Sequence, residues 1–173
     1  MPIMGFPGFL ASYEVRLSAP QGQIADFTAS RYGSKSDTSD SLQSGIGNIE
    51  NVQGDKSTVQ LGNGHTGTLA VDKSNNTANI VWSEGRWHIR VSEVGNTTPP
   101  IAEAKEVVAY LQSHFLPVPH DVGNIIVDAE GSDIHTNVVW QESNEIYGVD
   151  TKKPCKDPVQ TALAMVISMR NYS

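Results

Sequence analysis

Two stretches of this chain are alike, and their likeness limits the folds that the chain can adopt. Residues 80–111 align with residues 138–169 at a shift of 58 residues. The aligned positions are Ile80-Val81-Trp82-Ser83-Glu84 over Val138-Val139-Trp140-Gln141-Glu142, Pro100 over Pro158, Ala104 over Ala162, and Val108 over Val166. Self-similarity at a fixed spacing of this length predicts one supersecondary unit that is used twice. The alternative interpretation is a chance likeness at one favourable shift.

Each copy has the pattern of three strands followed by a helix. In the first copy, Trp87, Ile89 and Val91 alternate with polar residues, which is the period of a half-buried strand. Residues 83–86 are polar and contain glycine, so they predict the hairpin turn before that strand. In the second copy the inward positions are Thr136, Val138, Trp140, Tyr147 and Val149, on either side of a turn at residues 141–144.

A helix is predicted at the end of each copy. Both helices begin at a polar residue followed by proline, which is accepted in the first helical turn because its missing N–H needs no partner there. The apolar positions then recur at helical spacing, and the prolines at residues 117 and 119 end the first helix. These positions are Thr98-Pro99-Pro100 and Asp157-Pro158 for the starts, Ile101, Ala104, Val108, Leu111 and Phe115 for the first apolar stripe, and Val159, Ala162, Val166 and Met169 for the second.

The N-terminal third is less regular. Residues 13–18 alternate as a first strand, residues 34–45 are rich in Ser, Asp and Gly and predict a loop, and Asn63-Gly64 predicts a tight hairpin turn between residues 59 and 71. Residues 1–10 are apolar but interrupted by proline and glycine. That segment is too short to span a bilayer and is a poor signal peptide.

These patterns together predict an α+β fold, with an antiparallel sheet and helices packed on one face. We expect Trp82, Trp140 and Tyr147 in the core between sheet and helices. A chain of 173 residues suits a single domain spanning residues 1–173. Its parts are an N-terminal strand and loop region at residues 1–55, a first β-β-β-α unit at 56–116 and a second at 120–173.

Composition excludes several classes of partner. The net charge of −7 and a pI near 5.1 argue against nucleic acid and anionic membranes, because the basic residues are few and scattered. Cys155 is the only cysteine, so no intramolecular disulfide is possible. We expect no cofactor and no membrane-spanning segment. Only 18% of the residues are charged, which favours an extracytoplasmic location (secreted or cell-surface), with a cytoplasmic one as the alternative.

One set of motifs resembles a known group of proteins. The residues are Trp82, Glu84, Gly85, Trp87, Ile89 and Val91, followed by Val107, Val108, Tyr110, Leu111, Leu116 and Pro117, and then the Val138-Val139-Trp140 strand. This combination is similar to small secreted or lipoprotein-type domains of Gram-positive bacteria, most of which are uncharacterised. The resemblance implies an extracytoplasmic, non-catalytic role and assigns no functional residues. No cysteine stands near Met1 to carry a lipid anchor.

Candidate metal and catalytic groups are sparse. His114, His120, Asp121 and His135 are the densest cluster of zinc-type ligands, but their spacing puts them on no common helical face, and separate surface histidines are the favoured interpretation. Residues 37–40 lack the ligand run of a calcium loop. Glu84 and Glu142 match by the repeat at the hairpin tips. One alternative function is therefore a hydrolase with these two carboxylates in a groove between the halves.

The preferred hypothesis uses the sheet face opposite the predicted helices. His88, Arg90 and Ser92 point to that face, and the repeat adds Asp150. A sheet with one open polar face is a common docking surface. The sequence therefore predicts a non-catalytic binding or protein-interaction module that uses this face or pairs a strand edge with a partner. The protein or small-molecule partner is unidentified, and a homodimer is one option. A third hypothesis is a structural subunit of a cell-surface assembly.

Overall fold

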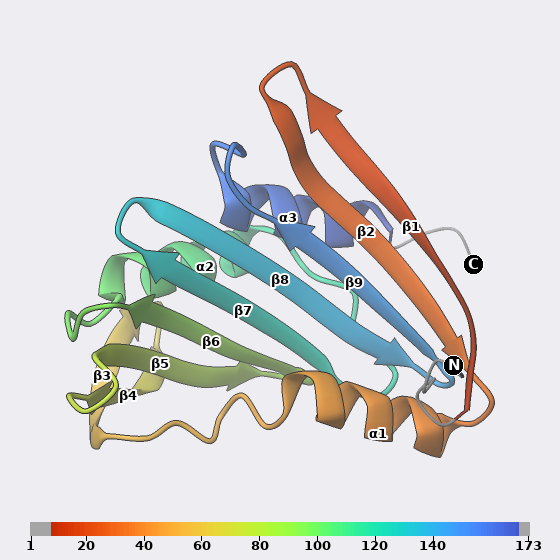
Figure 1. Cartoon of the computed structure of the whole chain (residues 1–173). Helices are drawn as coiled ribbons and strands as arrows, with labels where there is room; N and C mark the ends of the chain where they lie inside the picture. Colours follow the sequence, from red (N-terminus) through yellow and green to blue (C-terminus); the bar gives the residue numbers. More distant parts are fainter. Residues whose placement is uncertain (1–7, 170–173) are drawn as a thin grey trace.

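The structure is a computed structural model that describes residues 8–169, so residues 1–7 of the apolar segment at residues 1–10 lie outside that range. Nine strands form one sheet in the order β1-β2-β9-β8-β7-β6-β5-β4-β3, and three helices pack against it (Figure 1). The strands are β1 (Phe9–Ala19), β2 (Gly22–Tyr32), β3 (Asp55–Gly62), β4 (His65–Asp72), β5 (Thr77–Glu84), β6 (Trp87–Val94), β7 (Gly123–Glu130), β8 (Asp133–Glu142) and β9 (Glu145–Thr151). The helices are α1 (Lys35–Ile46), α2 (Ile101–Ser113) and α3 (Pro158–Ser168).

Tight turns join most neighbouring strands, as the sequence predicts. The backbone is left-handed at Asn63, Gly64, Gly85 and Ser143, with φ angles of 51°, 80°, 61° and 55°. Glycine and asparagine adopt that region with little strain, so these positions close the β3–β4 and β5–β6 hairpins at the predicted places. The β8–β9 hairpin turns at residues 143–144, also as predicted.

One strand pair departs from the predicted antiparallel sheet. β6 and β7 run parallel, with Trp87 opposite Gly123 and Val91 opposite Val127. The prediction of a purely antiparallel sheet is therefore wrong, and the sheet is mixed. The physical reason is the helix between these strands: α2 carries the chain back across the sheet, so β7 starts at the same end as β6.

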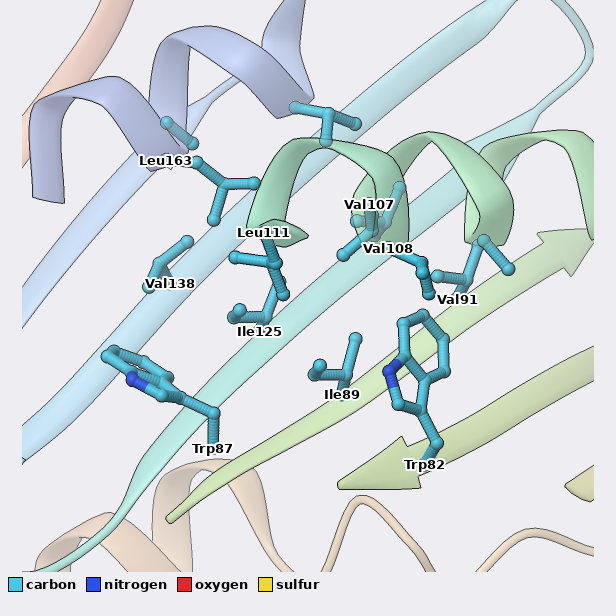
Figure 2. Packing of buried hydrophobic residues seen from close by; sticks show 14 of the residues in the cluster. Trp82, Trp87, Ile89, Val91, Val107, Val108, Leu111, Ile125, Val138 and Leu163 are labelled. Carbon is cyan, nitrogen blue, oxygen red and sulfur yellow. The ribbon is translucent and has the colours of Figure 1, made fainter. Parts of the chain in front are cut away.

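Two helices cover one face of this sheet. In Figure 1, α2 and α3 lie behind the strands, and Figure 2 shows Trp82, Ile89 and Val91 beside α2. The main apolar cluster joins strands β3 and β5–β9 to both helices. Its members include all three tryptophans, each no more than 6% exposed, so the prediction that Trp82 and Trp140 belong to the sheet–helix core is confirmed.

Close packing in this core depends on one small residue. A Cβ atom on Gly123 would lie 2.4 Å from Cε3 of Trp87, so the indole rests directly on the β7 backbone. The Nε1–H group of Trp87 donates to the carbonyl of Pro117, 3.1 Å away, which satisfies its polar edge. The ring of Trp87 also lies 6.3 Å from that of Trp140, centroid to centroid.

The third helix occupies the opposite face, which corrects two predictions. Residues 35–46 form α1 rather than a loop, and α1 lies in front of the sheet in Figure 1, so the helices are not all on one face. Ser34 begins α1, because its Oγ accepts a hydrogen bond from the backbone N–H of Asp37 at 3.1 Å. Leu42 is the buried apolar anchor of the helix. The Nε2 group of Gln141, on β8, donates to the carbonyl of Lys35 at 3.3 Å.

The face that carries α1 is thereby divided into two parts. Near α1, residues 47–54 also cover the strands, and Val52 packs on Ala70 and Val81. At the other end of the same face, none of the three helices of the described chain lies over the strands (Figure 1). We call this uncovered part, over strands β5–β9, the open face.

Candidate functional site

Four polar side chains form one row across the open face. Strand register places Asn79 beside Ser92, Ser92 beside Asp128, and Asp128 beside His135. These residues come from β5, β6, β7 and β8, so the row crosses the parallel junction. Ser92 Oγ donates to Asn79 Oδ1 at 2.6 Å, which orients the amide at one end of the row.

Arg90 lies one row nearer to α1 and is incompletely paired. Its Nη2 atom is 3.9 Å from Oδ1 of Asp128, a distance beyond an ordinary hydrogen bond. Its Nε atom is buried, and no acceptor for it exists among residues 8–169. The side chain is only 27% exposed. Such a guanidinium has lost water without gaining a full set of protein partners, which is energetically unfavourable.

A histidine–carboxylate pair stands at the other end of the row. His135 Nε2 contacts Oδ1 of Asp150 on β9, the strand next to β8. The carboxylate fixes the orientation of the imidazole ring, as a neighbouring acceptor does for histidines in many sites. Asp150 therefore belongs to this part of the surface through His135.

The row of four side chains and Arg90 line a hollow of about 620 Å³, which lies within the size range of small-ligand sites. Its walls carry both signs of charge: Arg90, Lys152 and Lys153 are cationic, and Asp128, Glu130 and Asp133 are anionic. We call it the charged hollow; Thr77, Asn79, Ser92, Val94, Ile134 and His135 complete its lining. Lys153 is already paired with Asp133 at 2.9 Å, whereas the contact of Arg90 with Asp128 is longer, at 3.9 Å.

The predicted site residues divide between two places. Arg90 and Ser92 line the charged hollow, and Asp150 adjoins it. His88 does not: it lines a separate hollow of about 340 Å³ beside α1. Its Nδ1 is 2.9 Å from Oε1 of Glu50 and 3.1 Å from the hydroxyl of Ser83. The hydrogen bond from Ser83, followed by that from His88, holds the pKa of Glu50 below its usual value.

Ser83, His88 and Glu50 do not form a catalytic triad. In a triad the nucleophile and the carboxylate contact opposite ring nitrogens of the histidine. Here both contact Nδ1 of His88. The arrangement orients the histidine without activating the serine through it.

Glu84 and Glu142 are also placed apart. Glu84 accepts a hydrogen bond from Nε1 of Trp82 at 3.0 Å, whereas Glu142 pairs with His120 at 2.9 Å. Their strands, β5 and β8, are three strand intervals apart, or about 14 Å at the usual strand spacing. Paired carboxylates in hydrolases lie within roughly 10 Å. The geometry therefore offers no support for a shared acid–base site.

The three histidines that the sequence offered as metal ligands lie apart and have separate partners. His114 stacks on Tyr110, His120 pairs with Glu142, and His135 pairs with Asp150. No group of three or more potential ligands occurs within the described part of the chain. Residues 37–40 lie in α1 and form no calcium loop.

The sequence did not predict an aromatic groove on the helix-covered side. Its volume is about 770 Å³, and its floor includes the side chains of Tyr13, Phe27, Tyr147 and Trp140. Phe27 and Tyr147 stack at 6.2 Å, and Tyr147 and Trp140 at 5.5 Å. Burial, together with a hydrogen bond to Glu145, raises the pKa of Tyr147 to about 12. The alternation at Tyr13 was visible in the sequence, but the pairing of β2 with β9, which assembles the floor, was not.

Comparison of the chain with protein-family models, with curated proteins and with solved structures finds no match in any of the three. Between residues 8 and 169 there is no helix with the length and apolarity that crossing a membrane requires. The function therefore has to be argued from the geometry of the surface.

Proposed function

We propose that this protein is a non-catalytic binding module whose binding site is the charged hollow of the open face. The ligand has an anionic group for Arg90 and a cationic or hydrogen-bond-donating group for the carboxylates around Asp128. A polar segment of a protein or a small dipolar molecule meets this description.

The state of Arg90 is the observation that carries this proposal. The side chain is largely desolvated, its Nε has no acceptor among the described residues, and its nearest carboxylate oxygen is 3.9 Å away. A bound carboxylate would give the planar guanidinium the close partner that it lacks. Because the Arg90 side chain is only 27% exposed, part of the desolvation that binding requires has already taken place in the free protein.

The opposite charges on the hollow walls support a dipolar ligand over a simple anion. Asp128, Glu130 and Asp133 border the same space as Arg90. A ligand with only negative charge would be attracted by Arg90 and repelled by these three groups. A ligand with both signs can satisfy both walls.

Glycylglycine, which carries both charges in a small molecule, is a suitable probe. We expect it to bind more tightly than acetate or methylammonium, as measured by the NMR shifts of backbone amides during titration. Arg90→Glu should weaken glycylglycine binding by about tenfold or more, because it replaces the attractive charge with a repulsive one. Lys73→Glu makes the same charge change in the exposed β4–β5 turn and should leave the affinity unchanged. Equal affinity of wild type and Arg90→Glu would refute the site.

We also propose that the two predicted β-β-β-α units are copies of one ancestral unit. The element order supports it, because β4-β5-β6-α2 and β7-β8-β9-α3 repeat the same sequence of elements. The matching tryptophans, Trp82 and Trp140, contribute to one cluster.

An extracytoplasmic location and a role as a structural subunit stay predictions from the sequence. The competing hydrolase needs Glu84 and Glu142 to cooperate, and their separate partners argue against it.

A further inference from the structure

β1 is an edge strand whose apolar side chains are unusually exposed. It pairs with β2 on one side, and no strand in residues 8–169 pairs with its other side. Five of the eight exposed large apolar side chains of the described chain lie on it: Phe9, Leu10, Tyr13, Val15 and Leu17. An exposed, long and apolar edge strand is a template for pairing with another strand.

The other edge of the sheet is protected. β3 is shorter than β1, and its outer positions carry Asp55, Lys56 and other polar residues. Its apolar residues, Val59 and Leu61, face the core, where α2 packs against the strand. Charge, short length and a covering helix are the usual means of blocking an edge. β1 is longer, and none of the helices between residues 8 and 169 packs against it to a comparable extent.

The charges on β1 are arranged so that the strand complements itself. Glu14 and Arg16 point to the same face, are 40% and 67% exposed, and flank Val15; within one chain they pair with each other at 2.7 Å. In an antiparallel pair of two β1 strands centred on Val15, Glu14 lies opposite the partner's Arg16, and Arg16 opposite the partner's Glu14. Centring the pair on Glu14 or on Arg16 would instead place like charges opposite each other, which is destabilising.

The apolar side chains agree with this same register. A pair centred on Val15 puts Tyr13 opposite the partner's Leu17 on the other face of the strand, and brings the two Val15 side chains together. The sequence of residues 11–19 is symmetrical about Val15, and residues 11–17 lie between the two irregularities of β1, near Phe9 and near Ser18. A twofold axis through that point uses the same surface on both copies, as in most homodimers.

We propose that the protein forms a homodimer by antiparallel pairing of β1 with β1 of a second copy, centred on Val15. The sheet then continues across the twofold axis, and the two charged hollows face the same side. The dimer is independent of the proposed ligand site, because β2 and β9 separate β1 from the strands around Arg90.

Charge exchange tests the pairing and its register. We expect wild-type protein to dimerise with rising concentration in sedimentation velocity. Glu14→Arg alone, or Arg16→Glu alone, places like charges opposite each other twice per dimer and should weaken dimerisation about tenfold or more. Mixing the two single variants should restore association as a heterodimer, because every opposed pair is then attractive. The double variant E14R/R16E should also restore the homodimer.

Asp55→Arg and Lys56→Glu make matched charge changes on β3 and should leave dimerisation unchanged. Thermal unfolding of each variant checks that it is folded, and the mixing experiment compares only folded chains. Wild-type protein that stays monomeric at every concentration overturns the proposal. So does a mixture of the single variants that associates no better than either one alone.

Discussion

Two buried threonines on neighbouring strands differ in whether their hydroxyl groups have a hydrogen-bond partner, and this difference affects the free energy of unfolding. Thr136 and Thr151 lie opposite each other on β8 and β9, and both are fully buried. Thr151 Oγ1 donates to the carbonyl of Pro158 at 2.6 Å. Thr136 Oγ1 has no hydrogen-bond partner among residues 8–169. A buried hydroxyl without a partner lowers stability, whereas a bonded one raises it.

Replacement of each threonine with valine should therefore have opposite effects. We expect Thr136→Val to increase the free energy of unfolding by about 1 kcal/mol, because a methyl group replaces an unsatisfied hydroxyl. Thr151→Val should decrease it by about 1–2 kcal/mol, because the carbonyl of Pro158 loses its donor. Urea unfolding followed by tryptophan fluorescence measures both. A loss of stability in Thr136→Val would show that its hydroxyl has a partner in solution.

Asp72 is the carboxylate with the strongest local hydrogen bonding. Its oxygens accept from the backbone N–H groups of Ser74 and Asn75, at 3.0 and 3.1 Å, and from both of their side chains, at 2.6 and 2.7 Å. The side-chain hydrogen bond from Ser74, followed by those from Asn75, lowers the pKa of Asp72 to about 2. The ionised carboxylate therefore closes the β4–β5 turn.

The contribution of Asp72 to stability should depend on pH in a defined direction. Because its pKa is lower in the folded chain than in the unfolded chain, near 3.9, the stabilisation is complete above about pH 4. It is lost as the pH falls through about 2. Asp72→Asn should be less stable than wild type at neutral pH, with a difference that narrows toward pH 2. Carbon-13 NMR of the carboxyl group should give a midpoint near 2, and a midpoint near 4 would contradict the hydrogen-bond network.

Only some of the residues that line the charged hollow could be predicted from the sequence. Alternation along β6 correctly assigns His88, Arg90 and Ser92 to one face, because side chains in a strand alternate strictly. It does not say which residues of other strands lie beside them. Asp128 joins Ser92 only through the parallel pairing of β6 with β7, and His88 is separated from Arg90 by the approach of Glu50 from the α1 side. Both facts depend on strand order.

Among the helices and strands, those with a regular apolar pattern were predictable from the sequence. The helix that depends on contacts with the sheet, α1, was not. The β3–β4, β5–β6 and β8–β9 hairpins and the cores of α2 and α3 follow from turn residues and apolar spacing. Phe115, predicted in the first stripe, instead lies beyond α2 and is exposed. α1 was missed because residues 35–46 have mostly weak helix formers and only two strongly apolar residues, Leu42 and the terminal Ile46. Contact with the sheet, through Leu42 and Gln141, stabilises α1, whose residues have low helix propensity.

Gln141 should control whether α1 stays on the sheet. Its side chain is 1% exposed; its Oε1 accepts from Ser39, and its Nε2 donates to the carbonyls of Lys35 and Ser143. Gln141→Leu removes all three hydrogen bonds, two of which tie β8 to α1. We expect amide hydrogen exchange in α1 to become about tenfold faster or more, while exchange in α2, on the other face, stays unchanged. Equal protection of α1 in both proteins would assign its stability to other contacts.

At the scale of the whole molecule, the sheet separates two kinds of surface. One face meets α2 and α3 and holds all three indoles; the other is half covered by α1 and carries the charged hollow at its uncovered end. The parallel junction of β6 and β7 lies under this hollow and brings Ser92 beside Asp128. One face thus holds the apolar core, and the other carries the proposed binding site.

The most direct test of this division is to map where glycylglycine binds over the entire chain by nitrogen-15 NMR. We expect the largest changes in chemical shift at Arg90, Asp128 and His135. The indole N–H signals of Trp82, Trp87 and Trp140 should not move. Changes concentrated at the indole signals would place binding on the helix-covered side and contradict the account.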